Sequence, residues 1–418
     1  MKVLIFQTGE PLPIDGDSLR LMRAGFLRDF LVLKGETVRL ISSRFFHQTK
    51  QHRHLSQDKL DAFNCVLIDS PGYKVNIGPR RFIDHAVLAW NLAKRLEMEA
   101  TPDAVFIGYP PIEAAYVLAK WCQKRGVPYV IDVKDLWPQI FVDFFPSWLR
   151  GIARLLFLPW FFMAKSAIDG AFAVCSISEP FLNEVKRNVG LERQPKDFVA
   201  HLTRPKDESQ KCSSHSVFVE NDLVAGANNR GQDVPTKLVF AGSFTRVFDF
   251  LPLKYALTEL ELKGLSIRVE LCGDGPNFNQ VKEIFQGFTN VNLNGWVTEA
   301  ELKQHYLEAF ATFAPYKPSL DFDLSIPNKL IESFSMGLPV ITSIGGYARH
   351  LILSNSQLGE VYEHLGDRSG ANLAMAIESL INRDRIQVLR DIARFYGEHF
   401  DFDTNYSRIR SALSEAAH

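Results

Sequence analysis

The chain has little of what marks a disulfide-bonded, membrane-spanning or nucleic-acid-binding protein. Its five cysteines are an odd number without a CxxC pair, and most lie in apolar runs, which indicates buried free thiols in a reducing cytosol. No apolar run reaches the ~20 residues of a spanning helix, and the opening MKVLIFQTGE turns polar too early for a signal peptide. The formal net charge of -1 lacks the basic excess of a general nucleic-acid binder. We therefore expect a cytoplasmic protein without a nucleic-acid partner.

One apolar segment stands out, residues 155–164 with the sequence LLFLPWFFMA. It contains Pro159, is too short to span a membrane, and has tryptophan and basic residues on its flanks. Such flanks are typical of a segment that lies in the membrane interface. Residues 148–165 are therefore predicted to make peripheral contact with the inner face of the cytoplasmic membrane. A helix buried between two domains would have the same composition, and this alternative stays open.

Short apolar strands alternate with amphipathic helices in two successive stretches, which predicts two doubly wound α/β domains with parallel sheets. The predicted strands are 3–6, 38–41, 104–107, 129–132 and 171–175, then 237–241, 268–271, 291–293, 312–314 and 340–342. The predicted organisation is a first Rossmann-like domain at 1–203, a polar insertion at 204–236, a second domain at 237–390, and C-terminal helices at 391–418 that could pack back on the first domain. Ligands of open α/β sheets bind beyond the carboxyl ends of the strands, so we expect a site in a cleft between two facing domains.

The loops of the second predicted domain carry residues suited to a phosphate. Its first two strands are followed by turns that contain Gly242, Ser243, Gly273, Asp274 and Gly275. A glycine at a strand end lets the backbone approach a phosphate closely, and the nearby Arg246 could supply positive charge. Each turn on its own could equally be structural.

The segment SIPNKLIESFSMGLPVI predicts a loop followed by a helix that starts near Asn328. A helix N-terminus presents backbone N–H groups and a partial positive charge, both suited to a pyrophosphate, and Lys329 adds a full charge. Ser325 and Pro327 belong to the loop before it. Glu332 follows Asn328 by one turn, where its carboxylate could accept both hydroxyl protons of a ribose. An ordinary solvated helix acid is the alternative for Glu332.

The run PNKLIESFSMGLPVI resembles the signature of retaining, nucleotide-sugar-dependent glycosyltransferases of family four, whose type B fold has two facing Rossmann-like domains. In that family the acid at the position of Glu332 binds the donor ribose, and the loop before it holds the diphosphate and donor sugar. The glycine turns match the family in order and spacing. The stretch that begins GWVTEAELKQ is similar to the base-binding region, which implies that Trp296 and Val297 lie near the nucleobase.

The first half of the chain agrees with this resemblance. VIDVKDLWPQ is similar to the (R/K)DLWP segment of bacterial family members that build surface polysaccharides and lipopolysaccharide. The likeness covers nearly the whole chain outside 205–236. It implies a retaining hexosyltransferase that uses a nucleoside-diphosphate sugar, with UDP as the expected nucleotide, and a polyprenyl-linked or saccharide acceptor.

Several positions depart from the family pattern. Leu324 stands where the family has its first glutamate, with Asp323 one residue away. Ser243 replaces an arginine for which Arg246 could substitute, and Arg349 replaces a frequent acid. These departures leave nucleotide binding better supported than the identity of the donor sugar.

The resemblance implies that Lys329, Arg246 and the helix N-terminus stabilise the leaving diphosphate. No DxD-type acidic pair follows a strand and no His or Cys spacing suits zinc, so neither a metal nor a cofactor is expected. Asp135 follows the strand at 129–132 and is the candidate for orienting the donor or acceptor sugar. It could equally cap the next helix.

A group of polar residues in the first predicted domain could bind an acceptor diphosphate. Its members are Glu10, Arg20, Arg23, His47, Lys50 and Lys134, the last at a position where relatives often carry histidine. A solvated basic surface explains them as well.

Two other functions stay open. A nucleotide-sugar epimerase would have the same fold, and a non-catalytic nucleotide- or glycan-binding protein could have lost turnover through Leu324 and Ser243. A nicotinamide-dependent dehydrogenase is disfavoured, because QTGEPLPIDG rather than GxGxxG follows the first strand.

Overall fold

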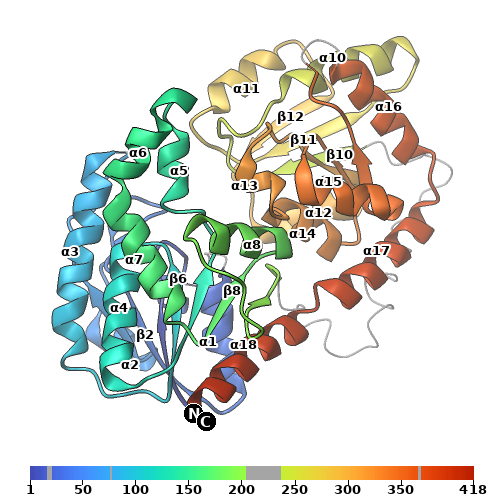
Figure 1. Ribbon diagram of the computed structural model, residues 1–418. Helices are drawn as coiled ribbons and strands as arrows, with labels where there is room; N and C mark the ends of the chain where they lie inside the picture. The colour runs from blue at the N-terminus through green and yellow to red at the C-terminus, as the bar shows by residue number, and fades with distance from the viewer. Residues whose placement is uncertain (17–20, 76–77, 204–236, 366–368) are drawn as a thin grey trace. The chain divides into compact units, whose positions relative to one another are not determined.

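The chain folds into two α/β units, each built around its own parallel sheet (Figure 1). The computed structural model describes residues 1–16, 21–75, 78–203, 237–365 and 369–418. The first unit comprises Met1–His201 and Asp403–His418, and the second comprises Leu202–Phe402. The predicted fold class of two parallel-sheet α/β domains is confirmed. The cleft expected between the two domains stays a prediction, and the predicted insertion at 204–236 lies outside the described residues.

The first unit has a seven-stranded sheet in the order β5-β2-β1-β6-β7-β8-β9. Its strands are β1 (Lys2–Phe6), β2 (Thr37–Ser43), β5 (Cys65–Ile68), β6 (Ala104–Tyr109), β7 (Tyr129–Val133), β8 (Ala173–Ser176) and β9 (Phe198–Val199). A separate antiparallel pair, β3 (Phe45–Phe46) and β4 (Gln51–His52), lies in the loop after β2. The central strands read as continuous apolar runs because helices cover both faces of the sheet.

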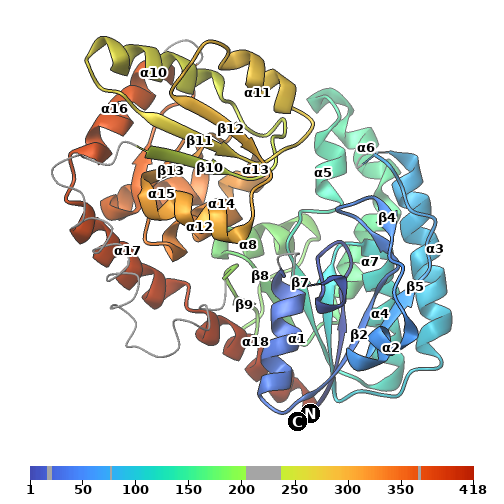
Figure 2. The ribbon, with the colours of Figure 1, turned by 180° about the vertical axis from the view of Figure 1, so that it is seen from behind.

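The helices of the first unit are α1 (Arg23–Leu33), α2 (Gln57–Ala62), α3 (Pro79–Leu96), α4 (Ile112–Arg125), α5 (Gln139–Asp143), α6 (Arg150–Leu156), α7 (Leu158–Asp169), α8 (Glu179–Asn188) and α18 (Phe402–Ala417). Helices α3, α4 and α7 lie together on one face of the sheet (Figure 1), and α1 lies on the other (Figure 2). The C-terminal helix α18 packs against α1, where the Phe30 and Tyr406 ring centroids are 5.9 Å apart.

The second unit has a six-stranded parallel sheet in the order β12-β11-β10-β13-β14-β15. The strands are β10 (Lys237–Ala241), β11 (Arg268–Cys272), β12 (Val291–Gly295), β13 (Ala309–Ala314), β14 (Val340–Thr342) and β15 (Gly359–Val361). The helices are α10 (Leu251–Leu262), α11 (Phe278–Ile284), α12 (Glu299–Glu308), α13 (Leu320–Asp323), α14 (Asn328–Ser335), α15 (Gly346–Ser354), α16 (Ser369–Ile381) and α17 (Arg385–His399).

The predicted domain boundary at residue 391 needs correction. It falls inside α17, which belongs to the second unit. The reason is packing: Ile392, Phe395 and Tyr396 of α17 are buried in the core of the second unit. The return to the first unit begins only at Asp403.

The cysteines match the sequence-based expectation where the structure describes them. Cys65, Cys122, Cys175 and Cys272 are buried free thiols, and burial raises the pKa of each thiol. Cys212 lies outside the described residues.

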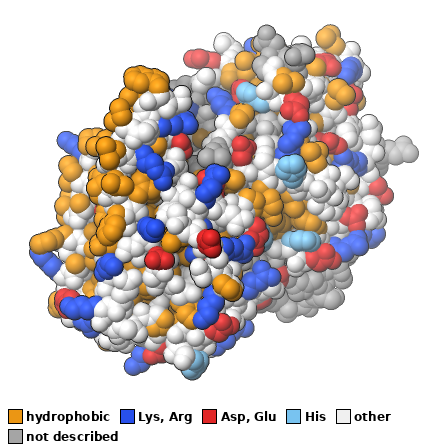
Figure 3. Space-filling model, viewed as in Figure 1, with side chains coloured by type: hydrophobic (Ala, Val, Ile, Leu, Met, Phe, Trp, Pro, Cys, Tyr) orange, Lys and Arg blue, Asp and Glu red, His pale blue; other side chains and the backbone are white. Residues whose placement is uncertain are grey.

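The apolar segment around residues 148–165 forms α6 and α7, and its side chains divide between core and surface. Phe161 is buried, and Trp160 donates a hydrogen bond from Nε1 to Glu113 Oε1 at 2.7 Å. We call the exposed side chains on and beside α3, α6 and α7 the apolar surface: Ile83, Phe144, Trp148, Ile152, Leu155, Leu156, Leu158 and Phe162. Figure 3 shows hydrophobic side chains gathered over these helices, with Lys and Arg beside them.

Among the described residues, no single helix is long and apolar enough to cross a membrane. The pair Ser147–Leu156 and Leu158–Asp169, bent by 67° at their junction, reaches that length and composition only when taken together.

Candidate functional site

The order of strands in the second sheet defines where a ligand would bind. The chain runs from β10 to β11 and β12 on one side, then returns to β13 on the other side of β10. At such a switch point, the loops that follow two adjacent strands run in opposite directions and leave a crevice at the carboxyl end of the sheet. Open α/β sheets bind their ligands in this crevice. The loop that starts at Gly242 follows β10, and α14 lies between β13 and β14. Most of the predicted donor-binding residues therefore come from this edge of the sheet.

Lys329 and Gly242 meet at this edge. The Lys329 ammonium donates a hydrogen bond to the carbonyl of Ala241 and lies 4.5 Å from the centre of the Phe240 ring. Gly242 has a φ of 133°, and a Cβ there would collide with Lys329 Nζ. The backbone conformation favours glycine at this position, and the absence of a side chain lets Lys329 approach the backbone closely. The result is a positive charge held against the backbone at the end of β10.

Helix α14 starts at Asn328, where the sequence predicted a helix start. Its N-cap is Pro327, which makes no side-chain hydrogen bond to the first turn. Ser325 and Pro327 are buried in the loop, and Asn328 is exposed. Glu332 is only 8% exposed, and its carboxylate adds to burial in raising the pKa of Tyr316. The alternative that Glu332 is an ordinary solvated helix acid is therefore wrong.

The glycine turns after β10 and β11 pack backbone against backbone. Gly273 donates a hydrogen bond to the Gly295 carbonyl at 2.6 Å, and a Cβ at Gly273 would collide with Gly242. A Cβ at Gly275 would lie 2.6 Å from the Phe244 carbonyl oxygen. The close backbone packing by itself explains why glycine occupies these positions, whether or not a ligand binds there. Asp274 is exposed, and its Oδ1 accepts a hydrogen bond from the Gly275 amide at 2.6 Å.

Other predicted donor residues are open to solvent. Ser243 and Arg246 are exposed, and Val297 is partly exposed. Trp296, directly after β12, is 70% exposed. An indole at that level of exposure leaves a flat aromatic face for stacking. Their roles in binding stay predictions.

Asp323 and Arg349, two of the residues involved in the departures from the family pattern, both contact other residues of the second unit. The Asp323 carboxylate lies beside Gly345, the N-cap of α15. Asp323 is the last residue of α13, so the end of α13 lies against the start of α15. Arg349, at the position of the family's frequent acid, forms an ion pair with Glu363.

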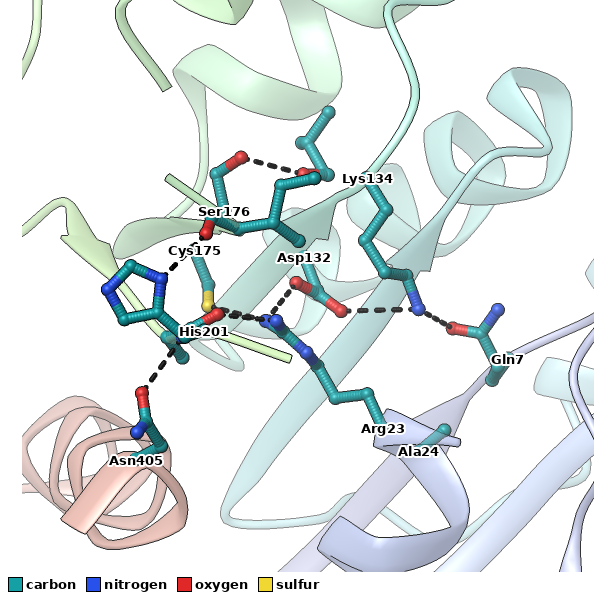
Figure 4. A network of polar contacts seen from close by, with 12 residues as sticks. Gln7, Arg23, Ala24, Asp132, Lys134, Cys175, Ser176, His201 and Asn405 are labelled. Atoms are coloured by element: carbon teal, nitrogen blue, oxygen red, sulfur yellow. Dashed lines mark hydrogen bonds and ion pairs between the residues drawn. The ribbon is translucent and has the colours of Figure 1, made fainter. Parts of the chain in front are cut away.

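In the first unit, Arg23 and Lys134 belong to one buried polar network around Asp132 (Figure 4). Arg23 Nη1 forms an ion pair with Asp132 Oδ1 at 2.8 Å, and Arg23 Nη2 donates to the Ala200 carbonyl. Lys134 pairs with Glu10 and lies 3.4 Å from Asp132 Oδ2.

Charge compensation explains how this network tolerates burial. Burial alone would lower the pKa of Arg23, but the Asp132 carboxylate raises it above its ordinary value. The same holds for Lys134, whose pKa is raised by Glu10 and Asp132 against the effect of burial. The buried Arg23 thus links β7 with the residue that directly follows β9. This interior position was not expected for an acceptor-binding residue.

Asp135 lies just after β7 and next to Lys134. It does not cap the next helix, because the N-cap of α5 is Pro138 and that cap has no side-chain hydrogen bond. Although Asp135 reaches solvent, desolvation by the surrounding protein raises its pKa against the lowering effect of Lys134 and Arg81. A carboxyl group in this setting can hold a sugar hydroxyl or exchange a proton with it.

His47 and Lys50 lie apart from the buried network, in the loop after β2. They contact Tyr73 and, through it, Arg81, neither of which the sequence pattern singled out. Arg20 lies outside the described residues.

The described parts of the chain contain no group of three or more His, Cys, Asp and Glu side chains arranged to hold a metal ion. The expectation of a metal-independent reaction without a cofactor stays a prediction.

The two units and the site at the switch point of the second sheet define a protein with the fold of type B glycosyltransferases. Residues 235–383 match the family model described as glycosyl transferases group 1. This match covers most of the second unit, including Gly242, Lys329 and Glu332. No curated protein sequence matches the chain.

Solved structures of the same fold match over the whole chain. One is HepE (Alr3699) from Anabaena in complex with UDP and glucose, at 14% identity and a TM-score of 0.61, covering 99% of this chain and 100% of that one. Another is the lipopolysaccharide outer core galactosyltransferase WaaB, at 15% identity and a TM-score of 0.62, covering 99% of both chains. A third, from Listeria monocytogenes and assigned as a UDP-N-acetylglucosamine 2-epimerase, has 12% identity and a TM-score of 0.57. This match covers 99% of the present chain and 96% of the Listeria chain. At these identities the likeness concerns the fold.

Proposed function

We propose that this protein is a retaining glycosyltransferase that moves a sugar from a UDP-linked donor to a lipid-linked or saccharide acceptor in surface polysaccharide or lipopolysaccharide biosynthesis. The observation that carries the proposal is the meeting of Lys329 with Gly242 at the start of α14, at the switch point of the second sheet. The family match over 235–383 and the UDP bound in HepE support the same donor chemistry.

The donor diphosphate would lie against Gly242, Lys329 and the N-terminus of α14. When the bond between the anomeric carbon and the phosphate oxygen breaks, negative charge grows on the leaving diphosphate. The ammonium and the helix N-terminus offset that charge without reorganising, which lowers the barrier. Arg246 is the second proposed cation. The acceptor hydroxyl attacks the face that the nucleotide leaves, and its proton passes to the departing phosphate.

The remaining donor contacts follow from their places in the second unit. Glu332 would accept the ribose hydroxyls, and Trp296 with Val297 would contact the base. The other proposed nucleotide-sugar contacts are Ser243, Gly273, Asp274, Gly275, Ser325, Pro327 and Asn328. In the first unit Asp135 would orient the sugar that is being transferred.

A nucleotide-sugar epimerase is the second candidate, since a protein with that assignment shares this fold. The two differ in what they need. UDP release from a UDP-sugar should depend on a lipid-linked acceptor if the protein is a transferase, whereas an epimerase forms the epimeric sugar, free or still linked to UDP, without any acceptor. Binding of UDP with neither release nor epimerisation of any donor would instead favour a non-catalytic nucleotide-binding protein.

The same assay tests the proposed role of Lys329. Lys329→Met keeps the apolar contact with Phe240 and removes the charge, so we expect kcat/KM for UDP release to fall about 10- to 50-fold. Lys282→Met, at an exposed lysine of α11, should leave kcat/KM unchanged. An equal effect of both variants, or none from Lys329→Met, would contradict the proposed leaving-group role.

We also propose that the protein contacts the inner face of the cytoplasmic membrane through the apolar surface. Trp148 is 78% exposed and Phe162 is 64% exposed, and Arg150 and Arg154 lie beside them. Apolar side chains next to basic ones suit the acyl boundary and the anionic headgroups of a bilayer. The inward-facing Phe161 and Trp160 fix α7 to the rest of the unit, so the segment would lie on the membrane rather than cross it.

Replacing Trp148, Leu155 and Phe162 together with serine should reduce binding to phosphatidylglycerol vesicles at least about tenfold, because each loses apolar area that the bilayer would bury. Vesicle sedimentation measures this directly. The matched control replaces Leu33, Leu262 and Leu353, which are also exposed, and should leave binding unchanged. Equal binding by all three proteins would contradict the membrane role of the apolar surface.

A further inference from the structure

A compact group of basic and aromatic side chains lies at the carboxyl edge of the first sheet, and the donor site does not use it. We call it the Tyr73 cluster: His47, Lys50, Tyr73 and Arg81. His47 and Lys50 come from the loop after β2, Tyr73 from the loop after β5, and Arg81 from the first turn of α3. His47, Lys50 and Arg81 thus meet at the ring of Tyr73.

The contacts within the Tyr73 cluster are close. His47 Nδ1 lies 2.6 Å from the Tyr73 hydroxyl and 2.9 Å from Lys50 Nζ. The Lys50 ammonium is 4.8 Å from the centre of the Tyr73 ring, and the Arg81 guanidinium is 5.4 Å from it. A hydrogen bond also links Arg81 with the Tyr73 hydroxyl. These contacts hold two cations over the same ring.

The cations repel each other. Burial, and then the charge of Arg81, lower the pKa of Lys50 to about 8. Burial, and then Lys50 and Arg81, lower the pKa of His47 to about 4, so the imidazole is neutral at pH 7. The nearby acids Asp84 and Asp135 act on Arg81, and the Asp84 carboxylate accepts a hydrogen bond from the Gly72 amide at 2.7 Å. Two cations, Lys50 and Arg81, are therefore held close together beside a neutral imidazole.

The start of α3 adds to the same positive potential. This helix has 18 residues, two arginines and no acid in its first turn, and no side-chain cap. Acidic residues are favoured at a helix N-terminus and basic ones are disfavoured, because the helix dipole is positive there. Arg80 and Arg81 therefore lie at the end of the helix where the dipole disfavours positive side chains. An anion bound at this point would offset both the helix dipole and the cations of the Tyr73 cluster.

Aromatic side chains connect the Tyr73 cluster with the apolar surface. The Arg81 guanidinium lies 4.3 Å from the centre of the Trp137 ring, and the Trp137 and Phe141 centroids are 4.5 Å apart. Phe82, next to Arg81, has its ring centroid 5.0 Å from Phe141 and 5.3 Å from Trp160 of α7. Figures 1 and 2 both show α6 beside one end of α3. The anionic and apolar sites are therefore neighbours in one unit.

We propose that the Tyr73 cluster binds the diphosphate of a lipid-linked acceptor, whose hydrocarbon chain stays in the membrane beside the apolar surface. This inference rests on the proposed transferase function and names its acceptor class. Arg81 and Lys50 hold the phosphate oxygens, the Tyr73 hydroxyl adds a donor, and neutral His47 orients that hydroxyl. Two cations beside one ring suit a diphosphate better than a neutral saccharide.

Inorganic pyrophosphate is the first probe, titrated by calorimetry with and without saturating UDP so that the donor site is occupied in one arm. Arg81→Gln and Lys50→Gln should each weaken pyrophosphate binding about 10- to 100-fold in both arms. Arg81→Lys, which keeps the charge, should lose less than Arg81→Gln. Lys94→Gln, thirteen residues further along α3 and about 20 Å away at 1.5 Å per residue, should have no effect. Unchanged binding in Arg81→Gln would overturn the proposal, and circular dichroism identifies a variant that fails to fold.

Phosphatidylcholine vesicles with and without farnesyl diphosphate distinguish a lipid-linked source from a free phosphate. Farnesyl diphosphate should increase sedimentation of the wild-type protein with the vesicles and leave that of Arg81→Gln unchanged. Pyrophosphate binding without any response to farnesyl diphosphate would overturn the lipid assignment. Because neither probe needs turnover, these outcomes are separate from a failure of acceptor-dependent UDP release, which would contradict the proposed function instead.

Discussion

Glu332→Ala is expected to weaken UDP binding by about 1.5–3 kcal/mol, the range for losing hydrogen bonds to a charged group. This corresponds to about 10- to 150-fold in Kd. The reason is that Glu332 is buried one turn beyond the start of α14, where its carboxylate would bind both ribose hydroxyls. Isothermal titration of UDP measures the effect without any need for the acceptor.

Two variants show whether the effect belongs to the ribose contact. Glu332→Gln keeps the shape and one carbonyl oxygen, so its loss should be smaller than that of Glu332→Ala. Glu398→Ala removes an exposed acid from α17 and should leave the Kd unchanged. Thermal unfolding of each variant checks that the second unit stays folded. Wild-type affinity in a folded Glu332→Ala protein would refute the ribose role.

Asp132→Asn should lower the free energy of unfolding of the first unit by about 3–5 kcal/mol, the range for breaking a buried ion pair. The carboxylate is fully buried, pairs with Arg23 at 2.8 Å, and lies 3.4 Å from Lys134. Asparagine has nearly the same shape but carries no charge. The variant would therefore leave two cations in the interior with only Glu10 to compensate them.

Denaturant unfolding followed by tryptophan fluorescence is suited to this measurement. Five of the six tryptophans lie in the first unit, at positions 90, 121, 137, 148 and 160, so the signal reports mainly on it. Asp69→Asn is the matched control, because it breaks a solvent-exposed pair with Arg44 in the same unit. Exposed pairs contribute about 0–1 kcal/mol. A loss no larger for Asp132→Asn than for Asp69→Asn would show that the buried network does not stabilise the unit.

The strands of the two sheets were predictable because a parallel strand covered on both faces is a continuous apolar run. The predicted strands 3–6, 237–241 and 340–342 correspond to β1, β10 and β14. Three edge strands were missed: β5, β9 and β15. β5 has four residues, β9 has two, and β15, with the sequence GEV, has three and begins with glycine. Segments of this length are too short to show a pattern that distinguishes them from a loop.

The donor site was more predictable than the first-unit site, for a physical reason. Asn328, Lys329 and Glu332 lie within one turn and a half of a single helix, so their spacing alone places them together. Arg23 and Asp132 are separated by 109 positions in the chain, and Tyr73 and Arg81 reach His47 only through the order of strands in the sheet. Sequence spacing contains no signal for contacts of that kind. The grouping of Arg23 with His47 and Lys50 therefore did not anticipate that Arg23 is buried against Asp132.

The predicted domain boundary at residue 391 was wrong for the same reason: the sequence pattern does not show which distant residues a helix packs against. The pattern of α17 is that of any amphipathic helix, and only its packing on the core of the second unit assigns it there. The sequence identified the C-terminal helices but not which of them returns to the first unit.

An experimental structure of the protein with bound UDP tests the central claim most directly. The diphosphate is expected to lie between Gly242 and the first turn of α14 within hydrogen-bonding distance of Lys329, with both ribose hydroxyls on Glu332. UDP bound elsewhere, with Lys329 still on the Ala241 carbonyl and Glu332 without contact to the ribose, would contradict the account.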